Sequence, residues 1–175
     1  MKTTFKIIDG NLHEFDSNGK EIHYKNSDGF EYWSDYGSHG KIIHYKNSDG
    51  YEWWSEYDSN GKEIHSKHSN GYEWWSEYDS NGKEIHLKDS NGYEIWREYD
   101  SDGNEIHFKD SDGYESWREY DSHGDLTHYK NSNGEEKWYD SNGNSITKEQ
   151  FDKLQASCDG KIIEVDGKKY RLTLI

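Results

Sequence analysis

The chain has 175 residues, no proline, one cysteine (Cys158) and a formal net charge of −15. Only 29% of its residues are hydrophobic, which is typical of disordered chains, but 16% are aromatic, and aromatic side chains supply the buried area that order requires. A single cysteine excludes an internal disulfide framework, and segment 1–10 has no apolar run of signal-peptide length, so we expect a cytoplasmic protein that does not enter a membrane.

The first predicted element is a β-hairpin. Residues 3–8 (TTFKII) and 11–15 (NLHEF) flank the dipeptide Asp9-Gly10. Asp-Gly between two apolar runs is a strong hairpin signal, because both residues tolerate positive φ. We therefore expect two antiparallel strands at the start of the chain.

A repeat of 21 residues follows and extends to about residue 145. It is marked by two series of glycines, separated alternately by 10 and 11 residues. The first series is Gly19, Gly40, Gly61, Gly82, Gly103 and Gly124, and the second is Gly29, Gly50, Gly71, Gly92, Gly113 and Gly134. A fixed period of this length indicates a repeat protein.

Each repeat is predicted to form two strands. In one unit, Asp58-Ser59-Asn60-Gly61 fits a four-residue turn, with strands expected at 62–67 and 72–78. Glycines at such positions adopt positive φ, which we expect for Gly61, Gly82 and Gly103. About six repeats give about twelve strands, which could form a twisted ribbon, a coiled solenoid of hairpins or a closed barrel.

Alternation with period two predicts which side chains share a sheet face. In the first strand of the unit, Ile64 and Ser66 are expected on one face, opposite Glu63, His65 and Lys67. In the second strand, one face is expected to carry Tyr51, Trp53 and Tyr57, and the other Glu52, Trp54 and Glu56. Positions that stay constant along an array usually make contacts between repeats, whereas variable ones are candidates for partner contacts.

The composition changes after Gly143. Thr147 and Gln150 form a capping box, with a hydrophobic staple from Ile146 to Phe151, so a short helix is predicted near 148–157. Two apolar segments around Asp166-Gly167 then predict a final hairpin. The predicted fold is all-β: a hairpin-repeat array at 1–145 and a small α/β cap at 146–175.

Several repeats contain a common phrase, seen as YDSNGKEI, YDSDGNEI, YDSNGNSI and YDSHGDLT. This phrase resembles the YD motif of RHS-type repeats, whose period is also near 21. More loosely, hairpins such as DGYEWWSEYDSNG resemble MORN-like repeats and cell-wall- or glucan-binding repeats. The resemblance covers residues 14–145 and implies a β-hairpin fold rather than an activity.

The sequence shows no catalytic arrangement, and we expect neither an enzyme nor a cofactor. The acidic turns resemble calcium loops, but turn formation explains the same residues without a metal. Histidines recur every 21 residues, at His23, His44, His65, His86, His107 and His128. Equivalent positions two strands apart are about 9–10 Å from each other, too far to share a zinc ion, so we expect packing beside Trp or a cross-strand Glu, with a pH-sensitive ladder as the alternative.

The acidic excess lies in the repeats, because residues 14–145 contain 13 Lys and Arg against 30 Asp and Glu. Such a surface repels nucleic acid and anionic membranes and attracts basic proteins. We expect a non-enzymatic interaction protein, most concretely an acidic inhibitor or nucleic-acid mimic acting on a basic nucleic-acid-binding protein such as a bacterial defence (CRISPR-type) nuclease. The expected contact residues are Glu52, Glu56, Glu73, Glu77, Glu94, Glu98, Tyr45, Trp53 and Trp74. The alternatives are an aromatic-lined carbohydrate or small-ligand module and a structural repeat or fragment of a longer array.

Overall fold

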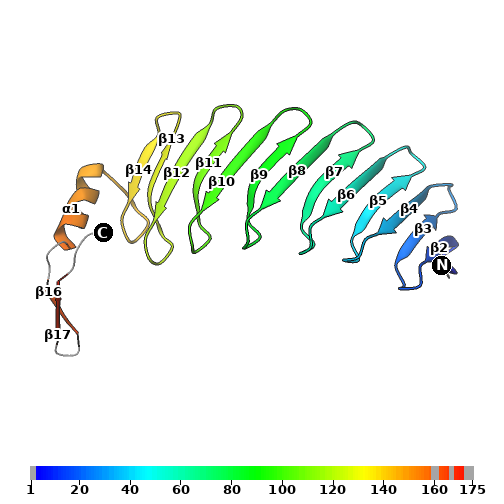
Figure 1. The fold of residues 1–175 in the computed structure, drawn as a ribbon, viewed down its shortest axis with the longest axis horizontal. Coiled ribbons are helices and arrows are strands. Elements are labelled where there is room, and N and C mark those ends of the chain that lie inside the picture. Colours follow the sequence, from blue (N-terminus) through cyan, green and yellow to red (C-terminus); the bar gives the residue numbers. More distant parts are fainter. Residues whose placement is uncertain (1–2, 159–161, 166–167, 172–175) are drawn as a thin grey trace. The chain divides into compact units, whose positions relative to one another are not determined.

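The structure is a computed structural model, and it describes residues 3–158, 162–165 and 168–171. These residues form strands joined by tight turns, with one short helix (Figure 1). The chain divides into two compact units, residues 1–95 and 96–175, which we describe separately.

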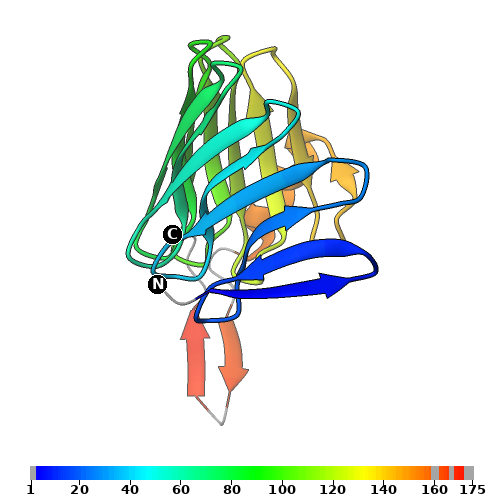
Figure 2. The same ribbon diagram turned by 90° about the vertical axis from the view of Figure 1, so that its right-hand side faces the viewer.

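In the first unit, every strand pairs antiparallel with the next strand of the chain. The strands are β1 (Thr4–Ile8), β2 (Asn11–Phe15), β3 (Glu21–Lys25), β4 (Glu31–Tyr36), β5 (Ile42–Asn47), β6 (Glu52–Tyr57), β7 (Glu63–His68), β8 (Glu73–Tyr78) and β9 (Glu84–Asp89). Strand β10 (Glu94–Tyr99) begins at the end of this unit. The predicted opening hairpin is β1–β2, drawn in dark blue in Figure 2, and both turn residues have positive φ (Asp9 51°, Gly10 82°).

The second unit continues the pattern and ends in a helix and a hairpin. Its elements are β11 (Glu105–Asp110), β12 (Glu115–Tyr120), β13 (Leu126–Asn131), β14 (Glu136–Tyr139), β15 (Ser145–Ile146), α1 (Lys148–Cys158), β16 (Ile162–Val165) and β17 (Lys168–Arg171). Strands β11 to β15 pair in sequence order, and β16 and β17 form a separate two-stranded sheet. The predicted helix and final hairpin are confirmed, although the predicted turn at 166–167 lies outside the described residues.

Helix α1 begins at the predicted capping box. The N–H of Thr147 donates to Gln150 Oε1 (2.9 Å), and the N–H of Gln150 donates to Thr147 Oγ1 (3.2 Å). The helix contacts β14. Phe151 of the predicted staple is half-buried, and Leu154, one turn further on, is exposed. Among the described residues, no helix has the length and apolar character needed to cross a membrane.

The order of strands β1 to β15 in the sheet is their order in the sequence (Figure 1). This order has two ends, so the sheet is open and a closed arrangement is excluded. The prediction of an antiparallel array of 21-residue hairpin repeats is confirmed.

The turns form as the sequence predicts. Asp58 Oδ1 accepts the backbone N–H groups of Asn60 and Lys62, both at 2.8 Å, and the Gly61 N–H donates to the Asp58 carbonyl (3.1 Å). The expected positive φ values are confirmed at Gly61 (78°), Gly82 (78°) and Gly103 (86°). The aspartates of these turns thus satisfy backbone donors that would otherwise lack partners.

A β-bulge recurs between successive hairpins and corrects part of the face assignment. Glu56 pairs with His65 but Tyr57 pairs with Glu63, so Ile64 is the extra residue. Ser55 Oγ donates to Glu63 Oε1 (2.5 Å), which places Glu63 on the face of Ser55 and Ser66. The predictions that Glu63 shares a face with His65, and Ile64 with Ser66, are therefore wrong, because strict alternation does not allow for a bulge.

Among the described residues of the first unit, 3–95, no helix or second sheet covers either face of the strands. Among the described residues, Ile95 is the only buried hydrophobic side chain, and the other buried residues are Gly61, Asp89 and five serines, Ser34, Ser55, Ser66, Ser76 and Ser116. A fold with so little interior depends on contacts between neighbouring strands and repeats.

Hydrogen bonds join successive repeats at both edges of the first unit. At one edge, Tyr57 Oη donates to the Ile42 carbonyl (3.1 Å), and Lys62 Nζ donates to the Gly82 carbonyl (2.9 Å). At the other edge, Ser69 Oγ accepts the N–H of Glu52 (3.1 Å), and the Ser69 N–H donates to the Glu52 carbonyl (2.7 Å). These contacts explain why Tyr, Ser and Glu stay constant at these positions along the array, whereas the Lys62 position changes to Asn104 and Asp125 in later repeats.

Candidate functional site

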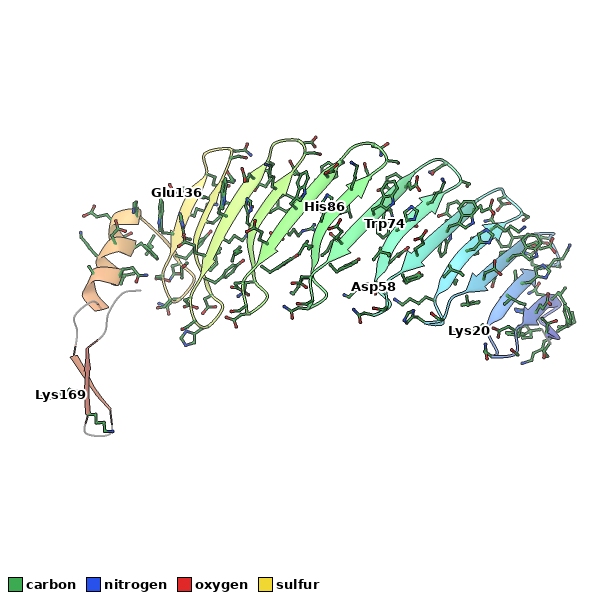
Figure 3. All side chains as sticks on the ribbon, viewed as in Figure 1. Lys20, Asp58, Trp74, His86, Glu136 and Lys169 are labelled. Carbon is green, nitrogen blue, oxygen red and sulfur yellow. The ribbon has the colours of Figure 1, made fainter. Side chains whose placement is uncertain are left out.

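The two faces of the sheet have different chemistry. On one face, which we call the charged face, Trp54 pairs with His44 and Lys67, and Glu56 pairs with His65. On the other, which we call the aromatic face, Trp53 pairs with Tyr45. Side chains project from both faces in Figure 3, in which His86 of the charged face and Trp74 of the aromatic face are labelled.

On the charged face, five histidine rings stack on the tryptophan across the hairpin. In the first unit the pairs are His23–Trp33, His44–Trp54 and His65–Trp75, with ring centroids 5.0, 5.2 and 5.1 Å apart and interplanar angles of 6°, 8° and 7°. In the second unit they are His107–Trp117 and His128–Trp138, at 5.4 and 5.1 Å. The expected packing of histidine beside tryptophan is confirmed.

Most of these histidines also lie between two carboxylates. His65 Nε2 is 2.8 Å from Glu73 Oε1, and His65 Nδ1 is 3.2 Å from Glu56 Oε1. The same arrangement occurs at His44, His107 and His128, with all distances at or below 3.3 Å. The expected cross-strand Glu contact is therefore also confirmed.

The carboxylates around each histidine fall into two classes. The inner carboxylates are partly covered and contact basic side chains. Glu73 is 23% exposed, and Glu94 accepts a hydrogen bond from Lys88 Nζ at 2.7 Å. The hydrogen bond from Lys88 is the main cause of a lowered pKa at Glu94, and a hydrogen bond from His86 adds to it, against a smaller opposing effect of burial. The outer ones are about 70% exposed and form a row along each unit: Asp35, Glu56 and Glu77, and then Glu98 and Glu119.

The structure separates the predicted contact residues by face. All six predicted glutamates contact histidines of the charged face: Glu52, Glu56, Glu73, Glu77, Glu94 and Glu98. The predicted aromatic residues lie on the aromatic face, because Tyr45 pairs with Trp53, and Ser66 pairs with Trp74. A partner seated on one face would therefore meet only one of these two sets.

The sequence analysis missed the aromatic residues that accompany the exposed carboxylates. Trp54 and Trp75 lie on the charged face and are 39% and 41% exposed. Each is two residues from an exposed glutamate of the same strand, Glu56 or Glu77. Alternation with period two predicted that Trp54 shares a face with Glu52 and Glu56, and this is confirmed. The constancy of this position along the array indicated contacts between repeats, so it was not expected to contact a partner.

On the aromatic face, the rings contact one another across strands. The ring centroids of Tyr24 and Tyr32 are 5.2 Å apart, those of Tyr32 and Tyr45 5.6 Å, and those of Tyr45 and Trp53 6.1 Å. Interplanar angles of 19° to 31° show that the rings stand roughly parallel. Their faces, which a sugar would need for stacking, are thus already in contact with neighbouring rings.

A shallow depression lies on the charged face between consecutive turns. It encloses about 730 Å³ and is lined by Ile64 and Trp75, with Asp58, Glu77 and Asp79 at its sides. Asp58 is labelled at its turn in Figure 3. In the part of the chain that the structure describes, no group of three or more His, Cys, Asp or Glu could hold a metal ion.

No protein-family model matches this chain, and no curated protein matches it. Among solved structures, it is similar to the crystal structure of TcdB2-TccC3-Cdc42 (TM-score 0.54, 19% identity) and to that of TcdB2-TccC3 without its hypervariable C-terminal region (TM-score 0.54, 19% identity). Each match covers 68% of this chain and 7% of the other. TcdB2-TccC3 is a Tc toxin protein with RHS/YD repeats, so the predicted resemblance to such repeats is confirmed at the level of fold.

Proposed function

We propose that this protein is a non-enzymatic interaction module whose charged face binds a basic protein. The observation that carries the proposal is the row of exposed carboxylates at equivalent positions, Asp35, Glu56 and Glu77, beside the exposed indoles of Trp54 and Trp75. A regular row of negative charge on a stiff sheet complements a groove lined by Lys and Arg.

In its most specific form, the proposal is that the row imitates a nucleic-acid backbone. The partner would then be a nucleic-acid-binding protein, such as a bacterial defence nuclease, encountered in the cytoplasm, and the module would act as its inhibitor. The net charge of −15 supports attraction to such a protein and repulsion from nucleic acid itself. Binding should weaken as salt rises, because screening acts most strongly on exposed charges.

Charge reversal tests this proposal. Replacing Asp35, Glu56 and Glu77 with Lys should abolish binding to a basic DNA-binding protein, and single-stranded DNA should compete with the unchanged protein. The matched control replaces Asp28, Asp49 and Asp112, exposed residues of the turns at the other edge, with Lys. Both variants change the net charge equally, so equal loss of binding in the two would contradict a specific role for the row.

A structural role within a longer hairpin array is the second candidate function. It is favoured by the 7% coverage of the TcdB2-TccC3 chains, which contain many more residues than this array. In that role the charged face would have no partner. Unchanged mobility of this protein in the presence of basic proteins at low salt would support it.

A further inference from the structure

The exposed carboxylates and indoles of the charged face form pairs. Trp54 and Glu56 lie two residues apart on β6, and Trp75 and Glu77 lie at the equivalent positions on β8. Residues so spaced on a strand project from the same face about 6.6 Å apart. Each pair thus offers an aromatic ring and a negative charge within reach of one long side chain.

The chain itself places cations on equivalent tryptophans. Lys46 Nζ lies 5.1 Å from the ring centroid of Trp33, and Lys130 Nζ lies 4.8 Å from that of Trp117. Lys148 Nζ, which comes from α1 and not from the sheet, lies 5.7 Å from the ring centroid of Trp138. Lys67 and Lys88 pair with Trp54 and Trp75 in the register, but their Nζ atoms lie beside Glu73 (3.9 Å) and Glu94 (2.7 Å) instead. Among the described residues, neither of these two rings has a Lys or Arg charge over it.

We infer that the Trp54–Glu56 and Trp75–Glu77 pairs each receive one arginine side chain of the basic partner; this inference rests on the proposed function. A cation over an indole is attracted by the ring, and a guanidinium can stack on it while it pairs with the adjacent carboxylate. Lys46, Lys130 and Lys148 show the same attraction within the chain. Lysine in the partner would keep the charge but lose the planar stacking.

The spacing of the pairs also defines the conformation of the partner segment. Strands β6 and β8 are two strand spacings apart, or about 9.6 Å. Three residues of polyproline II advance about 9.3 Å and return to the same side, so every third residue meets successive pairs. In a β-strand, residues three apart point to opposite sides, so alternate arginines of this spacing would face away from the sheet. In an α-helix, seven residues return to the same side but advance about 10.5 Å, which exceeds the spacing of the pairs. The partner segment therefore crosses the strands as a polyproline II helix with arginine at every third position.

Peptide binding tests this inference. One peptide repeats Arg-Pro-Gln four times. The other has the same composition, but its four arginines are placed two residues apart. We expect the first peptide to bind about fivefold more tightly, which is the value of one additional exposed cation–π contact. Calorimetry at two salt concentrations measures both affinities.

Three variants test which residues of this protein cause the preference for the first peptide. Trp75→Leu and Glu77→Gln should each remove the preference for the first peptide, and Trp74→Leu, on the aromatic face, should keep it. If Trp75→Leu does not fold, Glu77→Gln still tests whether the Trp75–Glu77 pair binds the peptide. Equal, salt-sensitive binding of both peptides would overturn the inference and leave the proposed function intact. If neither these peptides nor a basic protein binds, both are wrong.

Discussion

The imidazole of His65 lies flat against the indole of Trp75, with ring centroids 5.1 Å apart and planes 7° apart. The two residues belong to adjacent strands, β7 and β8, and pair directly in the register. The same imidazole contacts Glu73 and Glu56. The stack therefore connects the aromatic and the charged contacts of the face that we propose as the binding surface.

A double-mutant cycle measures this stack. His65→Ala and Trp75→Ala should each destabilise the protein, and the double variant should lose about 0.5–1.5 kcal/mol less than the sum, because aromatic pairs contribute that much beyond burial. Urea unfolding gives the free energies. Additive losses would mean that the two rings contribute independently of each other. Trp74 and Ser66, paired on the opposite face, supply a matched cycle without an imidazole.

Removing one hydroxyl should loosen the contact between neighbouring repeats. In Ser69→Ala, the N–H of Glu52 loses its acceptor, and we expect a loss of about 0.5–1.5 kcal/mol in the free energy of unfolding. Ser59 also occupies the second position of a turn, but its hydroxyl makes no hydrogen bond in the described part of the chain. Ser59→Ala should therefore change stability by less than about 0.5 kcal/mol. Similar losses in both variants would contradict the role given to Ser69.

The pKa values of the tyrosines at the edge opposite Ser69 predict a loss of stability at alkaline pH. Burial raises the pKa of Tyr57 and of Tyr78 above the ordinary 10.0, and nearby glutamates raise it further. A raised folded pKa stabilises the fold below the ordinary pKa, and this contribution is lost as pH rises through the folded value. Stability should therefore fall above about pH 10. Ultraviolet titration should show these tyrosines ionising later in the folded protein than in urea.

Tyr57→Phe separates the hydroxyl from the ring. The variant keeps the ring beside Lys41 Nζ but lacks the hydrogen bond to the Ile42 carbonyl, so it should lose about 1 kcal/mol at neutral pH. Its stability should also decline less at alkaline pH than that of the unchanged protein. An identical decline would show that Tyr57 does not contribute to it.

The turn glycines should tolerate no β-branched replacement. Gly82 has φ of +78°, and a Cβ there would lie 3.0 Å from Lys62 Cε, so Gly82→Val should cost more than about 1 kcal/mol. Ser80, in the same turn, does not have positive φ. Ser80→Val is the control and should cost less. Thermal unfolding followed by circular dichroism compares the two.

Glycine spacing and alternation predict much of this fold, because both are local properties. The positive φ of Gly61 follows from the turn, and the separation of Trp53 from Trp54 follows from the pleat. The bulge at Ile64 could not be predicted, since an extra residue in a strand has no sequence marker here. The extra residue places Glu63 on the aromatic face and not on the predicted face of His65 and Lys67.

The candidate site was predicted only in part. The acidic positions and the contacts of the histidines follow from the repeat. The exposure of each carboxylate does not follow from the repeat. Glu73 and Glu77 belong to one strand and one face, yet the side chain of Glu73 is 23% exposed and that of Glu77 is 71% exposed. The difference arises because Glu73 is held by His65 and lies near Lys67, which are on the neighbouring strand. Such covering depends on side-chain reach across strands, which a linear pattern does not describe.

Among the described residues of the first unit, the main contacts between elements join consecutive strands, from β1·β2 to β8·β9. A sheet built in this way behaves as a one-dimensional lattice, in which each hairpin is held by its two neighbours and by nothing more distant. Opening should then begin at the terminal hairpin and spread inward one hairpin at a time. Amide hydrogens of β1 and β2 should accordingly exchange with solvent faster than those of β5 and β6, in a gradient set by position along the chain.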